Sequence, residues 1–241
     1  MFIENRKRAV VKTVSWRLLA SLTTMGLVFL FVGKVSVAAV VGSVEVIAKM
    51  VLYYADERLW NKLNFGRREF EPFVLWLTGL SGAGKSTLAN EIYCKLKKKG
   101  YRIEQLDGDS IRDIFPQTGF SKEERDNHIK RVGYLASMLE KNGVIVISSF
   151  ISPYKETREF VRKMCNNFCE LYVSVSLEEC ERRDVKGLYQ KARAGEIKNF
   201  TGIDDPYEKP DNPEILIETE NNTVEKSVDC IMKKINKLYG V

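Results

Sequence analysis

The segment at residues 79–86 has the composition and spacing of a loop that binds phosphate groups. It reads Gly-Leu-Ser-Gly-Ala-Gly-Lys-Ser and ends on Lys85 and Ser86. Glycines let the backbone bend until successive N–H groups point at phosphate oxygens, the lysine reaches the β- and γ-phosphates, and the serine hydroxyl ligates Mg²⁺. The pattern therefore predicts nucleotide binding. The residues expected to make these contacts are Gly79, Ser81, Gly82, Ala83, Gly84, Lys85, Ser86 and Thr87.

The residues on either side predict the elements that would position this loop. Residues 73–78 form a continuous apolar run, as in a buried parallel strand. Residues 87–99 have a helical pattern that ends at Gly100, and the N-terminus of such a helix adds positive potential beside the phosphates. Strand, glycine-rich loop and helix thus occur in the order that a P-loop requires.

Two carboxylates, Asp107 and Asp109, follow the next predicted strand at residues 102–106. Phosphoryl transfer needs a carboxylate to hold Mg²⁺ directly or through water, and a carboxylate can also accept the proton of the attacking hydroxyl. Arg112 and Arg125, a short way along the chain, are candidates to bind a phosphate or sulfate group of the acceptor. A tight Asp-Gly turn with solvated acids is the alternative interpretation of this segment.

Strand and helix patterns continue to alternate after this point. Strands are predicted at residues 144–147, 170–175 and 215–217, and helices at residues 122–142, 155–166, 177–183 and 223–238. This alternation predicts an α/β domain, a P-loop NTPase-type parallel sheet with helices on both faces, whose ligands bind beyond the carboxyl ends of the strands. Residues 184–205 lack periodicity and are expected to form a lid over the phosphates, with an ordinary surface loop as the alternative.

Residue counts argue against several other classes of protein. The five cysteines are odd in number and form no Cys-x-x-Cys pair, which argues against a disulfide framework or a zinc site. A single histidine, His128, excludes a metal site built from several histidines. The net charge of +6 comes entirely from the first 70 residues, so we expect no nucleic-acid partner.

Residues 1–70 differ in composition from residues 71–241 and are expected to form a separate domain. Residues 18–33 carry no charge, residues 35–55 are mostly apolar, and basic side chains flank the two runs on their outer sides. A bilayer core of roughly 30 Å needs about 17–25 helical residues, and positive charge favours the cytoplasmic side. We predict a transmembrane helical hairpin that contacts lipid through residues 14–56, with both termini and the second domain in the cytoplasm. An apolar hairpin in the core of a soluble protein is the alternative.

Two charges interrupt the second apolar run. Glu45 and Lys49 lie at positions i and i+4, where they would share a helix face and pair at a helix–helix interface. A transport or relay site is the alternative interpretation. Ala38 and Gly42 would allow close helix packing, and because two helices alone bury little surface, we expect a homo-oligomer.

Both parts of the chain resemble known families. Residues 7–68 are similar to a small predicted two-helix membrane domain with no assigned activity, chiefly through residues 12–17 and 53–61. Residues 71–220 resemble the adenylylsulfate kinase family, which uses ATP and Mg²⁺ to phosphorylate the 3′-hydroxyl of adenosine 5′-phosphosulfate. The segments that carry this resemblance are residues 79–86, 106–109 with Arg112, 119–121, 149–154, 186–189 and 199–204.

The resemblance implies roles for individual residues. Catalytic roles would fall to Lys85, Asp107, Asp109 and Ser152, the last matching a serine named in the family as a phosphoenzyme site. Mg²⁺ would be held by Ser86 and Asp109, and the ATP end would include Arg183 and Lys186. The acceptor would be contacted by Asp107, Arg112, Phe120, Arg125, His128, Ile151 and Phe200. In-line transfer in a P-loop kinase requires no covalent intermediate, which weakens the expectation for the serine.

The sequence departs from the family pattern on the acceptor side. His128 stands where an asparagine that helps to bind the substrate is common, and residues 113–118 also differ from the usual pattern. These departures motivate one alternative, a P-loop kinase that acts on another nucleotide or sugar hydroxyl. A non-catalytic nucleotide-binding regulator of a membrane assembly is the other alternative, against which the complete phosphate loop and its carboxylates argue.

Overall fold

The computed structural model divides the chain into two compact units, Phe2–Glu69 and Phe70–Val241. The residues that the structure describes are 2–4, 6–31, 35–63, 67–108, 111–112, 119 and 121–241.

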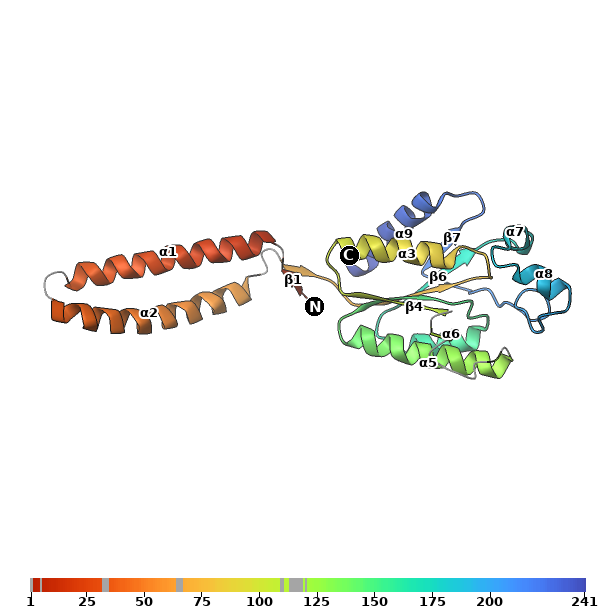
Figure 1. Ribbon diagram of the computed structural model, residues 1–241, viewed down its shortest axis with the longest axis horizontal. Helices are drawn as coiled ribbons and strands as arrows, with labels where there is room; N and C mark the ends of the chain where they lie inside the picture. The colour runs from red at the N-terminus through yellow and green to blue at the C-terminus, as the bar shows by residue number, and fades with distance from the viewer. Residues whose placement is uncertain are drawn as a thin grey trace. The chain divides into compact units, whose positions relative to one another are not determined.

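The N-terminal unit is a helical hairpin. Helix α1 (Arg6–Phe31) packs along α2 (Val35–Lys62), and the short strand β1 (Phe2–Glu4) pairs antiparallel with β2 (Arg67–Glu69) (Figure 1). Among the described residues, no helix contains a stretch long and apolar enough to cross a membrane. The two predicted helices are thus present, and their insertion into a bilayer stays a prediction.

Polar contacts join the two helices near the chain ends of the hairpin. The guanidinium of Arg8 is buried, donates to the carbonyl oxygen of Trp60 and lies 5.3 Å from the centre of its ring. Lys12 forms an ion pair of 2.9 Å with Glu57, and Trp60 Nε1 donates to Ser15 Oγ at 3.2 Å. Two of the basic residues predicted to flank the hairpin therefore hold its helices together.

The structure does not test the expected ion pair between Glu45 and Lys49. The side chain of Glu45 lies outside the described part of the chain, as does Lys34 between the helices. That pairing stays a prediction.

The C-terminal unit contains a five-stranded parallel sheet in the order β4-β5-β3-β6-β7. Helices α3 and α9 cover one face of the sheet, and α5 and α6 cover the other (Figure 1). The strands are β3 (Val74–Thr78), β4 (Ile103–Asp107), β5 (Ile145–Ser149), β6 (Phe168–Ser174) and β7 (Ile215–Glu218). The helices are α3 (Lys85–Lys98), α5 (Lys122–Lys141), α6 (Lys155–Met164), α7 (Leu177–Arg183), α8 (Leu188–Arg193) and α9 (Val224–Tyr239). The predicted α/β architecture is confirmed.

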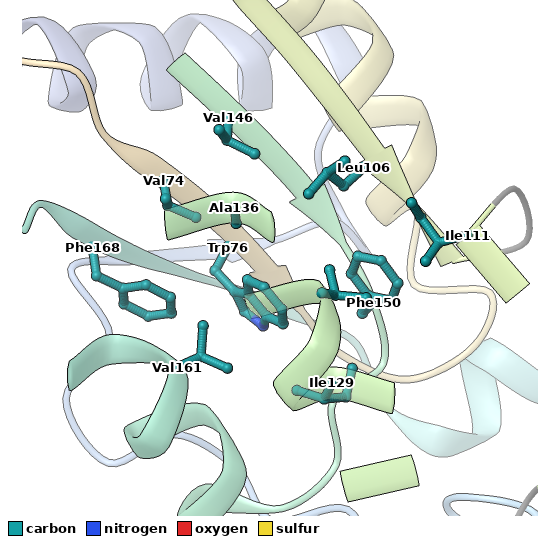
Figure 2. Packing of buried hydrophobic residues seen from close by; sticks show 11 residues of the cluster. Val74, Trp76, Leu106, Ile111, Ile129, Ala136, Val146, Phe150, Val161 and Phe168 are labelled. Carbon is teal, nitrogen blue, oxygen red and sulfur yellow. The ribbon is translucent and has the colours of Figure 1, made fainter. Parts of the chain in front are cut away.

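The core beneath the sheet centres on Trp76 of β3. All five residues of this strand are buried, as its continuous apolar sequence predicts. The Trp76 ring lies 5.6 Å from that of Phe150 and 6.0 Å from that of Phe168, with Val161 of α6 close by (Figure 2). Helix α5 approaches α6 closely at Gly133, where a Cβ atom would lie 2.5 Å from a methyl group of Val161. Packing on this face therefore requires glycine at that position.

The segment at residues 184–205, for which the sequence predicts a lid, includes regular structure although its sequence lacks periodicity. It contains α8, which begins after Gly187 with its φ of 65°. The carboxylate of Asp184 accepts bonds from the backbone N–H groups of Tyr189 and Gln190 at 3.1 and 3.0 Å. These bonds satisfy donors that a helix N-terminus leaves free. Tyr189 and Ala192 also give the short helix a buried face, which the sequence pattern did not predict.

Candidate active site

The phosphate loop lies between β3 and α3, at the carboxyl end of the sheet. Gly82 and Gly84 have φ angles of 77° and 93°, which glycine adopts more readily than other residues. A Cβ atom at Gly84 would meet nothing within 4 Å, so the backbone angle, rather than crowding, accounts for glycine at this position. Lys85 follows as the first residue of α3. The loop thus has the conformation that its sequence predicts.

Lys85 is buried and folds back onto the loop. Its Nζ donates to the carbonyl oxygens of Gly79 at 3.0 Å and Leu80 at 2.7 Å. Burial lowers the pKa of Lys85 to about 8, and the neighbouring ammonium of Lys186 acts in the same direction. A polyphosphate beside Nζ would favour the charged form, so nucleotide binding and protonation of this lysine are expected to be coupled.

Oxygen atoms from three segments meet beside the loop. Ser86 Oγ donates to Asp107 Oδ1 at 3.2 Å and lies 3.4 Å from Ser149 Oγ. Mg²⁺ takes oxygen ligands and in phosphoryl-transfer sites is bound by one or two protein groups together with substrate phosphates and water. Among the described residues, no group of three or more His, Cys, Asp or Glu side chains could hold a metal ion. The donor set of Ser86 and Asp107 therefore fits Mg²⁺.

A single cleft of about 420 Å³ connects this loop to the expected acceptor residues. Its walls include residues from the loop, from the ends of β4 and β5, from α5 and from the lid. The sequence-predicted residues among its lining are Ser81, Gly82, Gly84, Lys85, Ser86, Thr87, Asp107, Arg112, Arg125, His128, Ile151, Ser152, Lys186 and Phe200. Tertiary structure thus brings together residues that are more than a hundred positions apart in the chain.

Several predicted residues are placed elsewhere. Arg183 lines no part of the cleft and instead donates to Glu179 Oε1 at 2.7 Å and to the Thr219 carbonyl oxygen at 3.1 Å. Gly79 and Ala83 also lie behind the lining residues, and Ala83 is fully buried. Asp109, Phe120 and residues 113–118 lie outside the described part of the chain, so their roles stay predictions.

Arg125 is held by the segment that follows the lid helix. Its Nη1 donates to Thr201 Oγ1 and to Asp205 Oδ2, both at 2.7 Å, and its Nη2 donates to the Asn199 carbonyl oxygen. Tyr154 also donates to Asp205, at 2.9 Å, and burial together with this carboxylate raises the pKa of Tyr154 to about 12. Sequence reasoning missed Tyr154 and Asp205 as partners, because neither lies near Arg125 in the chain.

His128 lies in the cleft wall with both ring nitrogens unused. The residue is 1% exposed, and neither nitrogen has a hydrogen-bond partner among the described residues. Its ring meets that of Phe150 edge-on at 5.9 Å. Burial, with additional repulsion from Arg112 and Arg131, lowers the pKa of His128 to about 4, so the imidazole is neutral at neutral pH. An unpaired buried polar group costs about 1–3 kcal/mol, which a bound ligand with a donor or acceptor would offset.

The lid contacts the phosphate loop through Tyr189. This side chain is buried, its hydroxyl donates to the Ser81 carbonyl oxygen at 2.9 Å, and its ring packs edge-on against Phe200 at 5.0 Å. Neither contact was predicted, although Tyr189 belongs to the segment that carries the family resemblance. Tyr189 therefore contacts both the phosphate loop and Phe200.

Comparison with known proteins gives two family matches. The family model described as "Adenylylsulphate kinase" matches residues 71–218, which is more than half of the chain. The model described as "Predicted membrane protein (DUF2061)" matches residues 10–61.

Individual relatives agree with the first match. The adenylyl-sulfate kinase of Picosynechococcus sp. is 53% identical over 171 residues, which cover 70% of this chain and 97% of the relative. The structure of the Mycobacterium tuberculosis APS kinase CysC in complex with AMPPNP and APS is 37% identical with a TM-score of 0.66, and the match covers 69% of this chain and 98% of that one. A hexameric APS kinase from Thiobacillus denitrificans is 33% identical with a TM-score of 0.55, over 71% of this chain and 30% of that one.

Proposed function

This chain belongs to the adenylylsulfate kinase family, and from that premise we propose that it transfers the γ-phosphoryl group of ATP to the 3′-hydroxyl of adenosine 5′-phosphosulfate. The observation that carries the proposal is one cleft lined both by Lys85 and Ser86, which follow the glycine-rich loop, and by Arg125 and His128 of α5. The related M. tuberculosis enzyme was solved with AMPPNP and APS, the same two classes of ligand.

Lys85 and Ser86, together with the carboxylates at and after the end of β4, would act in this transfer. Lys85 would leave its two carbonyl partners to neutralise the β- and γ-phosphates, and Ser86 and Asp107 would hold Mg²⁺, which offsets negative charge on the transferring group when bound. A bond forms between the acceptor oxygen and Pγ while the bond from Pγ to the oxygen of ADP breaks. Asp109 is proposed to accept the hydroxyl proton.

The test is a direct assay of the full chain in detergent with ATP, Mg²⁺ and adenosine 5′-phosphosulfate. Equal amounts of ADP and the 3′-phosphorylated product are expected, at roughly 1–100 turnovers per second. ATP binding without transfer would refute the proposed acceptor. It would favour the second candidate, a kinase for another nucleotide or sugar hydroxyl, which the unusual residue His128 motivates.

We further propose that the N-terminal hairpin tethers the kinase to the cytoplasmic face of a membrane. The match to a predicted membrane family supports this, as do apolar side chains that both helices expose, among them Val14, Leu18, Ile47 and Val51. The full chain should stay in the membrane pellet after alkaline carbonate extraction, whereas a variant that lacks residues 2–69 should not. Release of the full chain into the supernatant would refute the tether.

A homo-oligomer is also proposed, on the precedent of the hexameric relative. Light scattering of the detergent-solubilised chain, corrected for bound detergent, would report its protein mass. A mass equal to one chain at all concentrations would refute this proposal.

A further inference from the structure

Residues 150–153 leave β5 and line the cleft, where the ring of Phe150 meets that of His128, a proposed acceptor residue. The turn contains Ser152, which has a φ of 39° although it is not glycine. Residues with a Cβ atom reach this left-handed region only at a cost in free energy, so the surrounding structure must stabilise the turn. Strain of this kind is commonly retained where it positions a functional group.

The Ser152 hydroxyl uses its bonds within the protein. Ser152 Oγ accepts from Trp76 Nε1 and donates to Thr78 Oγ1, each at 3.1 Å, and the residue is 3% exposed. Thr78 Oγ1 in turn donates to the carbonyl oxygen of Ile151 at 2.7 Å. For this hydroxyl to attack a phosphate, it would have to leave both partners and the turn would have to open.

Arg158 holds the same turn from behind. Its Nη1 donates to the carbonyl oxygen of Ser152 at 2.7 Å, its Nη2 to that of Glu208 at 2.8 Å, and its Nε to Glu170 Oε1 at 2.7 Å. The guanidinium is almost completely buried, and Glu170 neutralises it. One planar group thus connects the cleft wall, the segment after the lid and strand β6.

The connection to the segment after the lid has a second part. The backbone N–H of Glu208 donates to the carbonyl oxygen of Pro153 at 2.9 Å, and Glu208 Oε2 accepts from the N–H of Lys155 at 2.7 Å. Arg158 itself is absent from the cleft lining. Any effect of Arg158 on a ligand must therefore pass through the turn that it holds.

We propose that Arg158 is a positioning residue that fixes the acceptor wall at residues 150–153 through the carbonyl oxygen of Ser152. The inference rests on the proposed function insofar as the acceptor binds at this wall. The nucleotide end is built from β3 and α3, and Arg158 makes no described contact with the phosphate loop. Its loss should therefore affect the acceptor more than ATP.

The first test compares Arg158→Lys with Arg162→Lys. Lysine keeps the positive charge but cannot donate in three fixed directions at once, whereas guanidinium can. Arg162 lies on the same helix and pairs with Glu170 and Glu214, but makes no described contact with the turn. Arg158→Lys should raise the KM for the acceptor about tenfold while the Kd for AMPPNP changes less than threefold, and Arg162→Lys should change neither. Equal acceptor KM values in the two variants would overturn the proposal.

Hydrogen exchange gives a readout that needs no acceptor. Peptides that cover residues 150–158 and 205–210 should exchange faster in Arg158→Lys than in Arg162→Lys. The carbonyl oxygens of Ser152 and Glu208 lose their guanidinium donor, which loosens the turn that carries the Pro153 carbonyl, the acceptor of the Glu208 N–H. If the wild-type chain does not phosphorylate adenosine 5′-phosphosulfate, the proposed function fails while this measurement still decides the positioning role. Unchanged exchange in both segments would overturn that role.

Discussion

The neutral state of His128 makes a prediction about how stability depends on pH. The folded chain holds the pKa of His128 at about 4, against 6.5 for an unperturbed histidine. Between these two values the unfolded chain binds more protons than the folded chain, so stability rises with pH across this window. Because of His128 alone, the free energy of unfolding of the wild-type chain should be about 2 kcal/mol lower at pH 5 than at pH 7.

The assay is urea denaturation of the wild type and His128→Asn at pH 7 and at pH 5, without ligand. Asparagine does not titrate, and carboxylates that titrate in both proteins cancel in the difference. The free energy of unfolding should fall further in the wild type than in the variant, by about 2 kcal/mol. Parallel losses in the two proteins would refute the argument that burial, together with Arg112 and Arg131, keeps this imidazole neutral.

Four further substitutions test the site and the fold. Lys85→Ala removes the cation proposed to neutralise the transferring phosphate and should lower kcat by roughly a thousandfold or more, measured as ADP release; activity within a few-fold of wild type would contradict this. Asp109→Asn removes the proposed base, so it should lower kcat far more than it weakens AMPPNP binding as measured by calorimetry. Asp205→Asn leaves the nearly buried Arg125 without its carboxylate and should cost about 3 kcal/mol in urea denaturation; a loss below 1 kcal/mol would show that the pair is effectively solvated. Gly133→Ala places a methyl group against Val161 and should lower stability by about 1–2 kcal/mol, because the clash outweighs the better helix propensity of alanine.

Local sequence was sufficient for the phosphate loop because all its parts are adjacent in the chain. The glycines, Lys85, Ser86, the strand before them and the helix after them lie within one short segment, and the structure arranges them as predicted. The alternation of apolar strands with amphipathic helices likewise predicted the parallel sheet, since each pattern reports which faces of an element are buried. For residues 14–56, the length of the apolar runs predicted the structure less completely. The two helices are present, and their span across a bilayer stays a prediction.

The acceptor side shows where local sequence was insufficient. The expected role of Ser152 came from family resemblance, and that of Arg125 came from residue type as well as resemblance. Neither kind of evidence reports what surrounds a side chain. Arg125 meets Asp205 from 80 positions away, and Ser152 bonds to Trp76 and Thr78 on a neighbouring strand. These partners are set by the order of the strands and by the path of the chain after the lid.

The sequence by itself determined the chemistry of the phosphate end, because a loop that wraps one anion needs only consecutive residues. Tertiary structure alone decided which groups line the cleft beside the phosphate loop, because hydrogen-bond partners and burial depend on chain segments that meet only after folding. His128 illustrates the difference. Its position was visible in the sequence. Its neutral state, and the lack of a hydrogen-bond partner for either ring nitrogen among the described residues, result from its burial in the cleft wall.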